Sequence, residues 1–312
     1  MLRLSFIVPV YNVEPYIEEC IRSLYNQDIP QEEYEVICVD DCSPDGSRAI
    51  VERLQKEYST LKLLTHTENK RQGGARNTGM KVAQGRYIWY VDSDDYIKSN
   101  CLKNLLELAE KEDLDILDFD FDADYSKQQF VKNDESYEMG PCTGADYVFN
   151  TAHSGKWSWR CVCVGGGIIK HSLISDMLFR EKVQYEDNDF ALLMYARAKR
   201  VRHIPDRPYY YRVVEQSTVN VKPTSRQLEY DLSLIKEYVR LLRLNQWNDY
   251  RWREGVKELL NYSASELYVK LMNVSHEEKK MFYTHIMKYL PSTWRWMNRK
   301  LWLRLIFSIF IC

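Results

Sequence analysis

Short apolar runs alternate with amphipathic segments over the first hundred residues. The apolar runs have the length and composition of buried strands, and they are Leu4–Val10, Tyr34–Val39, Leu61–Thr65 and Tyr87–Val91. Between them, apolar residues recur at helical spacing over Tyr16–Gln27, Ser47–Tyr58 and Thr78–Ala83. This order predicts an α/β fold with a parallel sheet and crossover helices.

The pattern changes after the fourth strand. Cys101–Lys111 predicts another helix, and Leu114–Tyr125 then alternates between aspartates and apolar residues. Such alternation predicts a strand, and we expect its acidic side to be a solvated face or a sheet edge rather than a metal motif. Three consecutive glycines at 165–167 allow a turn, a bulge or a close approach of the backbone to a ligand.

Amphipathic helices dominate the C-terminal third. They are predicted over Gln227–Leu244, Arg251–Met272 and His276–Leu290. We therefore expect a domain at 1–220, with a nucleotide-binding half at 1–98 and an acceptor-binding half at 99–220. An α-helical region at 221–293 and a tail at 294–312 follow.

The tail combines basic residues with tryptophans and ends in an apolar octet at 305–312. The octet is shorter than the roughly 20 apolar residues that span a bilayer. A basic amphipathic helix with tryptophans is typical of the membrane interface. The alternative is a helix that packs on its own domain or on the partner of a homodimer formed through the C-terminal helices.

Composition narrows the class of protein. Charged residues make up 28% of the chain and the net charge is −2, which gives no global basic excess for binding nucleic acid. The eight cysteines include no CxxC pair, and no signal peptide precedes the first strand. Reduced thiols in a cytoplasmic protein are therefore expected. The six histidines form no metal-binding cluster.

Two acidic clusters follow predicted strands, at Asp40–Asp45 and at Asp92–Asp95. Clustered carboxylates beside a buried strand are costly unless a cation lies near them. Open α/β sheets bind their ligands at the carboxyl ends of the strands. The clusters therefore indicate a site for a metal ion and a nucleotide. Helix capping accounts for only one aspartate of the second cluster.

These clusters belong to a longer series of motifs in which the chain resembles family 2 glycosyltransferases of the bacterial surface-polysaccharide type. The motifs are Pro9-Val10-Tyr11-Asn12, Val39-Asp40-Asp41, Gly73-Gly74-Ala75-Arg76-Asn77, Asp92-Ser93-Asp94-Asp95, Glu186-Asp187, and Tyr209-Tyr210-Tyr211-Arg212 with Ser217. The resemblance covers roughly residues 3–220. It implies the GT-A fold, a Rossmann-like nucleotide-binding mixed sheet flanked by helices, here with an α-helical C-terminal appendage. It also implies sugar transfer with inversion of configuration.

The resemblance assigns the donor site residue by residue. It implies Asp94 as the ligand of Mn²⁺ or Mg²⁺, and Asp41 as the carboxylate that reads the base. The other residues implied for the donor site are Pro9, Tyr11, Asn12, Arg76, Asp92, Ser93 and Arg212. UDP is the nucleotide we expect, although GDP and dTDP donors occur among relatives. Two alternatives stay open: a salt bridge from Arg76 to an aspartate that holds the two acidic loops together, and helix capping by Asp45.

Inverting transfer also needs a base for the acceptor hydroxyl. The resemblance implies Asp187, with Glu186 and Asp189 as neighbouring alternatives. Glu186, Trp157, Trp159 and His171 are candidates for the acceptor pocket, although core packing is the more frequent use of tryptophan.

The sequence thus predicts a non-processive hexosyltransferase that uses a nucleotide-sugar, with UDP-sugar as the expected donor. The acceptor would be a saccharide, plausibly lipid-linked, in surface glycan biosynthesis at the inner face of the cell membrane. The alternatives are a catalytically inactive nucleotide-binding scaffold and a nucleotidyltransferase. The second usually has a glycine-rich, lysine-containing loop after its first strand, which Val10–Glu14 lacks.

Overall fold

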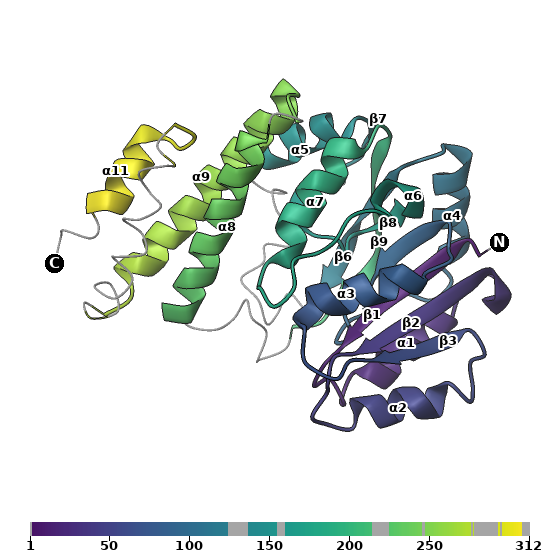
Figure 1. Ribbon diagram of the computed structural model, residues 1–312. Coiled ribbons are helices and arrows are strands. Elements are labelled where there is room, and N and C mark those ends of the chain that lie inside the picture. The colour runs from purple at the N-terminus through teal and green to yellow at the C-terminus, as the bar shows by residue number, and fades with distance from the viewer. Residues whose placement is uncertain are drawn as a thin grey trace. The chain divides into compact units, whose positions relative to one another are not determined.

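The computed structural model describes most of the chain (Figure 1). The described residues are 2–123, 137–154, 160–213, 225–244, 247–275, 277, 293 and 295–307. The chain divides into two compact units. The first comprises Met1–Gly144, Cys163–Phe190 and Arg197–Val214, and the second comprises Ala145–Val162, Ala191–Ala196 and Glu215–Cys312. The predicted boundary near residue 220 lies outside the described residues.

One mixed sheet organises the first unit. Its strands are β1 (Leu4–Val10), β2 (Tyr34–Asp40), β3 (Leu61–Thr65), β4 (Tyr87–Tyr90), β5 (Tyr96–Ile97), β6 (Ile116–Ala123), β7 (Met139–Cys142), β8 (Gly167–Lys170) and β9 (Val201–Tyr211). They follow the order β3-β2-β1-β4-β8-β6-β9-β5, and β7 also pairs with β9. The first four pair in parallel, whereas β8 runs antiparallel to both β4 and β6. The four predicted strands are thus confirmed.

Helices cover both faces of this sheet. They are α1 (Ile17–Tyr25), α2 (Ser47–Leu54), α3 (Arg71–Val82), α4 (Leu102–Lys111) and the short α6 (His171–Ile174). Apolar residues of α1, α2 and α4 share one buried cluster with Phe6 and Val8 of β1. On the other face, Ala75 of α3 packs with Ile37 and Val39 of β2, and the ribbon shows α3 crossing β1 and β2 (Figure 1). The pleat sends alternate side chains of each strand to opposite layers.

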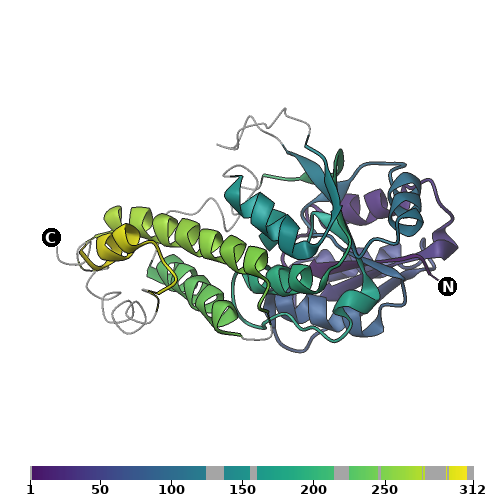
Figure 2. The ribbon, with the colours of Figure 1, turned by 90° about the horizontal axis from the view of Figure 1, so that it is seen from above.

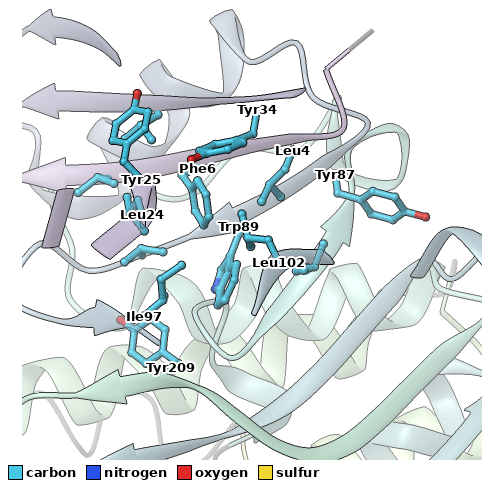
Figure 3. Packing of buried hydrophobic residues seen from close by; sticks show 14 of the residues in the cluster. Leu4, Phe6, Leu24, Tyr25, Tyr34, Tyr87, Trp89, Ile97, Leu102 and Tyr209 are labelled. Carbon is cyan, nitrogen blue, oxygen red and sulfur yellow. The ribbon is translucent and has the colours of Figure 1, made fainter. Parts of the chain in front are cut away.

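Aromatic rings fill the larger core cluster. Phe6 lies between Tyr34 and Trp89, with ring centroids 6.0 and 5.5 Å away (Figure 3). The Trp89 indole is fully buried and donates its N–H to the carbonyl oxygen of Gly165 at 3.0 Å. A buried indole N–H needs such a partner. The glycine stretch before β8 is therefore fixed to the core by a polar contact.

The last strand of the first unit, β9, contains Pro205 and Pro208. Its register against β6 shifts between Phe119 and Phe121, which pair with Ile204 and Tyr209. Both prolines fall inside this irregular stretch, where a missing backbone N–H costs no ladder hydrogen bond. The shift allows an eleven-residue strand despite two prolines.

The aspartates of β6 overturn the expectation of a solvated acidic face. β6 lies inside the sheet between β8 and β9, and Asp118 and Asp120 are 3% and 7% exposed. The fully buried His203 of β9 approaches Asp118 Oδ2 through Nδ1 at 2.5 Å and Asp120 Oδ1 through Nε2 at 3.7 Å. The neighbour of these carboxylates is a histidine from a distant segment, which an alternating pattern cannot reveal.

The second unit is helical. It contains nearly all of α5 (Gly144–His153), with α8 (Ser225–Arg243), α9 (Tyr250–Met272) and α11 (Arg299–Phe307). Helices α8 and α9 lie side by side (Figure 2). They run antiparallel, because Lys270 pairs with Asp231 while Arg253 donates to the Leu242 carbonyl at the other end. The predicted helices near 227–244 and 251–272 are confirmed, and the one at His276–Leu290 lies outside the described residues.

The described part of the tail packs within the second unit. Met297 and Leu305 are 7% and 0% exposed, Arg253 lies over the Trp296 ring, and the Asn298 N–H donates to Asn261 of α9. The packing alternative therefore accounts for these apolar residues, while Arg299, Lys300 and Arg304 stay exposed. Among the described helices, none has the length and apolar character needed to cross a bilayer.

Candidate active site

The three parallel strands β1, β2 and β4 end at the same edge of the sheet. Val10 pairs with Asp40, and Ile7 pairs with Tyr90. The loops that follow these strands therefore converge, as open α/β sheets require for a ligand site. One loop carries Asn12, the second carries Asp41, and the third begins at Val91.

The first two loops are joined by side chains. Asn12 has a φ of 55°, a left-handed conformation that asparagine tolerates well. Asp45 accepts hydrogen bonds from the Glu14 N–H and the Ser47 hydroxyl, at 2.8 and 2.7 Å. Glu14 in turn accepts from the Gly46 N–H at 2.8 Å. Asp45 thus fixes the start of α2 to the first loop. Beside this junction, Pro9 is buried in β1 and Tyr11 is half-exposed.

Asp41 belongs to a hydrogen-bond network with His66 and Lys70 that the sequence did not reveal. Its Oδ1 accepts the Lys70 backbone N–H at 2.8 Å and contacts His66 Nδ1 at 2.6 Å. His66 Nε2 contacts the Thr78 hydroxyl of α3 at 2.8 Å, and Asn69 donates to the Asp41 carbonyl. His66 follows β3 directly, so its position at the end of a strand was the available signal.

Arg76 bridges two acidic segments. Its side chain is 5% exposed, and it donates to Asp92 at 2.9 Å and to Glu186 at 2.6 Å. Burial works against its charge, but the neighbouring Asp92, Glu186 and Asp187 together raise the pKa of Arg76. The guanidinium also lies over the Phe179 ring. The expected alternative had Arg76 hold the two acidic loops together, whereas the observed salt bridges join the β4 loop to α7 (Glu186–Arg197).

Gly73 and Asn77 let α3 approach the segment before α7. The sequence predicts a helix only from Thr78, but α3 begins at Arg71. A Cβ on Gly73 would lie 2.2 Å from the Arg180 carbonyl oxygen. Asn77 exchanges two hydrogen bonds with the backbone of Phe179, at 2.9 and 2.8 Å. Close packing thus overrides the low helix propensity of glycine.

The loop after β4 holds four polar residues, Asp92–Asp95. Asp95 is buried, and it accepts from the Tyr209 hydroxyl at 2.5 Å and the Arg212 N–H at 2.7 Å. Burial, followed by the charges of Asp94 and Asp92, raises the pKa of Asp95. Ser93 is also buried, at 6% exposure.

Arg212 is fastened to this loop from the end of β9. It donates to the Asp94 carbonyl at 2.8 Å and to Glu19 of α1 at 2.6 Å, and its guanidinium lies over the rings of Tyr16 and Tyr96. Three segments distant in the sequence, α1, the Asp92–Asp95 loop and the end of β9, therefore meet here.

Asp94 has the electrostatic character of a cation ligand. Burial first, and then the charge of Asp92, raises the pKa of Asp94 to about 6. A divalent cation between these two carboxylates would remove that repulsion. Within the described residues, no group of three or more His, Cys, Asp or Glu side chains is arranged to hold a metal. Asp92 and Asp94 thus fit an ion that takes its remaining oxygens from a ligand.

The acidic residues at the start of α7 differ in their partners. Glu186 is bound to Arg76, and Asp189 is bound to Arg180 at 2.9 Å. Asp187 makes no ion pair with the described residues and accepts from the Asn188 amide at 3.0 Å. Burial, then the charge of Glu186, raises the pKa of Asp187 to about 7. Asp187 is thus the one of the three suited to exchange a proton near neutral pH.

Of the remaining candidates, only His171 lies among the described residues. His171 lies at the opposite end of β4, where Nδ1 contacts the Gly85 carbonyl at 3.1 Å, so its predicted role in the acceptor pocket is wrong. Trp157, Trp159 and Ser217 lie outside the described residues.

Known proteins resemble this chain in sequence and in fold. The sequence model of the family described as Glycosyl transferase family 2 matches residues 5–178. The protein named uncharacterized glycosyltransferase EpsJ of Bacillus subtilis (strain 168) is 33% identical over 264 residues, covering 82% of this chain and 73% of EpsJ. Poly(ribitol-phosphate) beta-N-acetylglucosaminyltransferase TarS of Staphylococcus aureus (strain Mu50 / ATCC 700699) is 39% identical over 117 residues, covering 38% of this chain and only 20% of TarS.

Solved structures confirm the GT-A fold. The crystal structure of S. aureus TarS 1–349 in complex with UDP is 25% identical in sequence and has a TM-score of 0.71, covering 93% of this chain and 81% of that chain. The mannosyltransferase PcManGT from Pyrobaculum calidifontis, in complex with GDP-Man and Mn²⁺, has a TM-score of 0.61 over 99% of this chain and 86% of that chain. At 19% identity, this second likeness concerns the fold alone.

Proposed function

Because the chain belongs to glycosyl transferase family 2, we propose that it transfers a sugar from a UDP-sugar to a saccharide acceptor with inversion of configuration. It is a glycosyltransferase of the hexosyltransferase type. One observation carries the proposal: the Arg76 guanidinium bridges Asp92 and Glu186. This contact brings the loop of the metal candidate Asp94 close to the base candidate Asp187.

The donor assignment rests on Asp41 and the acidic loop. TarS has been crystallised with UDP and with UDP-GlcNAc, which supports a uridine nucleotide here. Asp41 presents a carboxylate at the end of β2, where it suits the N–H of a uracil base. The loop around Asp92 and Asp94 would hold Mn²⁺ or Mg²⁺. When bound, such an ion supplies positive charge to the diphosphate as it leaves.

Arg76 and Arg212 add positive charge to the donor site. Both are already fixed by carboxylates, so their guanidinium groups are oriented before a donor arrives. A diphosphate near Asp92 or Asp94 would gain charge-assisted hydrogen bonds from such groups. Pro9, Tyr11, Asn12 and Ser93 would line the nucleotide.

Asp187 would remove the proton of the acceptor hydroxyl. The acceptor oxygen then attacks the anomeric carbon in line with the departing diphosphate, in one displacement without a covalent enzyme intermediate. The raised pKa of about 7 makes Asp187 a stronger base than an ordinary aspartate. Glu186 would keep Arg76 oriented beside the donor and contact the acceptor from there.

The acceptor is proposed as a surface glycan, plausibly lipid-linked. The names of relatives include poly(ribitol-phosphate) transferases, but the match covers only 18 and 20% of their lengths. Their acceptors therefore do not carry over to this chain, and the acceptor pocket of this chain is assigned only as a class.

We propose that the exposed cations of α11 bring the enzyme to the inner face of the cell membrane as a peripheral protein. Arg299, Lys300 and Arg304 are exposed while Leu305 is buried, and each exposed cation near anionic lipid contributes about 1 kcal/mol. Replacing all three with glutamine should release the protein from vesicles of phosphatidylglycerol, and vesicles of phosphatidylcholine serve as the control. Equal sedimentation of the wild type and the triple variant with both vesicles would contradict membrane docking by these residues.

Thermal stabilisation by nucleotides tests the donor site directly. A ligand at 100 times its dissociation constant adds roughly 2.7 kcal/mol to the free energy of unfolding. We expect UDP to raise the Tm more than GDP, dTDP or CMP, and to do so only with Mn²⁺ or Mg²⁺ present. Asp94→Asn should abolish the metal-dependent part. No shift with any nucleotide, with or without metal, would contradict the proposed donor site.

A further inference from the structure

Asp41 has one oxygen engaged and one oxygen open within the described part of the chain. Oδ1 accepts the Lys70 N–H at 2.8 Å and faces His66 Nδ1 at 2.6 Å, whereas no hydrogen bond of a described residue reaches Oδ2. The Asp41 and His66 side chains are 4% and 7% exposed, so water contributes little to fixing either of them. The orientation of the carboxylate therefore depends on His66 and Lys70.

The hydrogen-bond partners of His66 determine which of its ring nitrogens carries a hydrogen. An ionised carboxylate only accepts hydrogen bonds, so Nδ1 of His66 must carry a hydrogen. The Thr78 hydroxyl can either donate to Nε2 of a neutral ring or accept from Nε2–H of a charged one. The hydrogen on Nδ1 therefore points at Asp41 in both charge states of the ring, and Thr78 holds the ring in that orientation at 2.8 Å.

On the basis of the proposed function, we propose that His66 is a positioning residue for the nucleobase. By holding Oδ1, it leaves Oδ2 as a fixed acceptor for the ring N–H of uracil. A fixed carboxylate also disfavours cytosine, since the ring N3 of cytosine has a lone pair in place of that N–H and the two acceptors repel. His66 would thus set the preference for uridine over cytidine nucleotides without touching the substrate.

Three variants separate this role from a merely structural one. His66→Leu removes the hydrogen bond to Asp41 and retains an apolar side chain of comparable bulk. His66→Asn retains an N–H close to the position of Nδ1 and is the matched conservative control. Thr78→Val retains the His66 imidazole but removes its contact with the Thr78 hydroxyl. This variant keeps the test available if His66→Leu does not fold.

The measurements are the dissociation constants of UDP and CDP with Mn²⁺, together with KM and kcat for the donor once it is identified. Loss of a hydrogen bond to a charged group typically weakens an interaction by about tenfold or more. In His66→Leu we expect the UDP dissociation constant and the donor KM to rise about tenfold. CDP binding should change little, and kcat should stay near the wild-type value. His66→Asn should restore most of the preference for UDP over CDP, and Thr78→Val should lose part of it.

Some results would contradict the role of His66 alone, and one would contradict the proposed function as well. An unchanged UDP-to-CDP ratio in His66→Leu would overturn the inference, and so would an equal loss of both ligands. If His66→Leu does not fold, an unchanged ratio in Thr78→Val would overturn it. A wild-type protein that binds UDP no more tightly than CDP would overturn it while leaving sugar transfer intact. A wild-type protein that binds no nucleoside diphosphate would overturn the proposed function as well.

Discussion

Three carboxylates at the start of α7 differ in the cations around them, and this difference assigns their roles. Glu186 and Asp189 are held by arginines, whereas Asp187 is the one without an ion pair to a described residue. Asp187→Asn removes the basic group and retains its size, so donor binding should persist. Turnover should fall by about 10²- to 10⁴-fold, as is typical for the loss of a general base. Steady-state rates together with UDP binding check this, and normal turnover would refute Asp187 as the base.

A matched control exists for that substitution. Asp176 has a 70% exposed side chain paired with Arg197, which is not one of the candidate site residues. Asp176→Asn should therefore leave turnover unchanged. A loss in both variants would indicate a general effect of removing negative charge.

The pKa of Asp187 predicts the pH dependence of the reaction. Only the deprotonated carboxylate accepts the proton of the acceptor, and burial together with the charge of Glu186 raises its pKa to about 7. Turnover should therefore rise with pH through about 7 and level off above it. The rate as a function of pH, at saturating donor and acceptor, measures this limb. A flat profile between pH 5 and 8 would contradict the assignment.

At the scale of elements, the contact of α3 with the segment before α7 is the one most sensitive to size. Gly73→Ala would place a methyl group 2.2 Å from the Arg180 carbonyl oxygen, so one of the two backbones must move. Overpacking of this kind typically costs about 1–3 kcal/mol. We expect a lower Tm and weaker donor binding, because Arg76 lies three residues further along α3.

Gly165→Ala is the control for this substitution. Its added Cβ would meet the Tyr90 carbonyl oxygen at an ordinary 3.6 Å, so its Tm should stay close to the wild-type value. An unchanged Tm in Gly73→Ala would show that the contact has room to relax.

The elements that the sequence predicted are those with a simple period. The buried runs of β1 to β4 and the amphipathic faces of α1, α2 and α4 needed no tertiary information. The start of α3 was missed because two glycines oppose a helix unless close packing requires them. The strand β9 was missed because of Pro205 and Pro208, which are tolerated only where its register against β6 shifts.

The candidate site was predictable to the same degree. Sequence motifs identified Asp41, Arg76 and Asp94 as candidates, because carboxylates and guanidinium groups indicate by themselves what they can bind. His66 was missed because a lone histidine after a strand gains meaning only from its contacts with Asp41 and Thr78.

At the scale of the whole molecule, the acidic site lowers the stability of the free protein. The pKa of Asp94 is raised from 3.8 to about 6, first by burial. A raised folded-state pKa means that the native protein holds this proton more tightly than the unfolded chain. The stabilising contribution is thus complete below about pH 3.8 and is lost as pH rises through about 6.

Asp94→Asn should therefore stabilise the ligand-free protein at pH 8, by on the order of 2 kcal/mol, and should have little effect at pH 4. With UDP and Mn²⁺ present at pH 8, the order should reverse, because only the wild type gains from the ligands. Thermal denaturation of both proteins at the two pH values checks this. A variant less stable than the wild type at pH 8 without ligands would contradict it.

The place of β9 in the sheet has a consequence for folding during synthesis on the ribosome. Among the described strands, β5 at residues 96–97 pairs only with β9 at residues 201–211. The loop before β5 is held by Tyr209 and Arg212. A nascent chain that has emerged only as far as β6 therefore exposes an unpaired strand edge and an acidic loop that lacks Tyr209 and Arg212. Contacts between such distant residues slow folding and leave intermediates prone to aggregate. The partly synthesised chain should thus bind chaperones. It should bind the donor only after Arg212 has emerged.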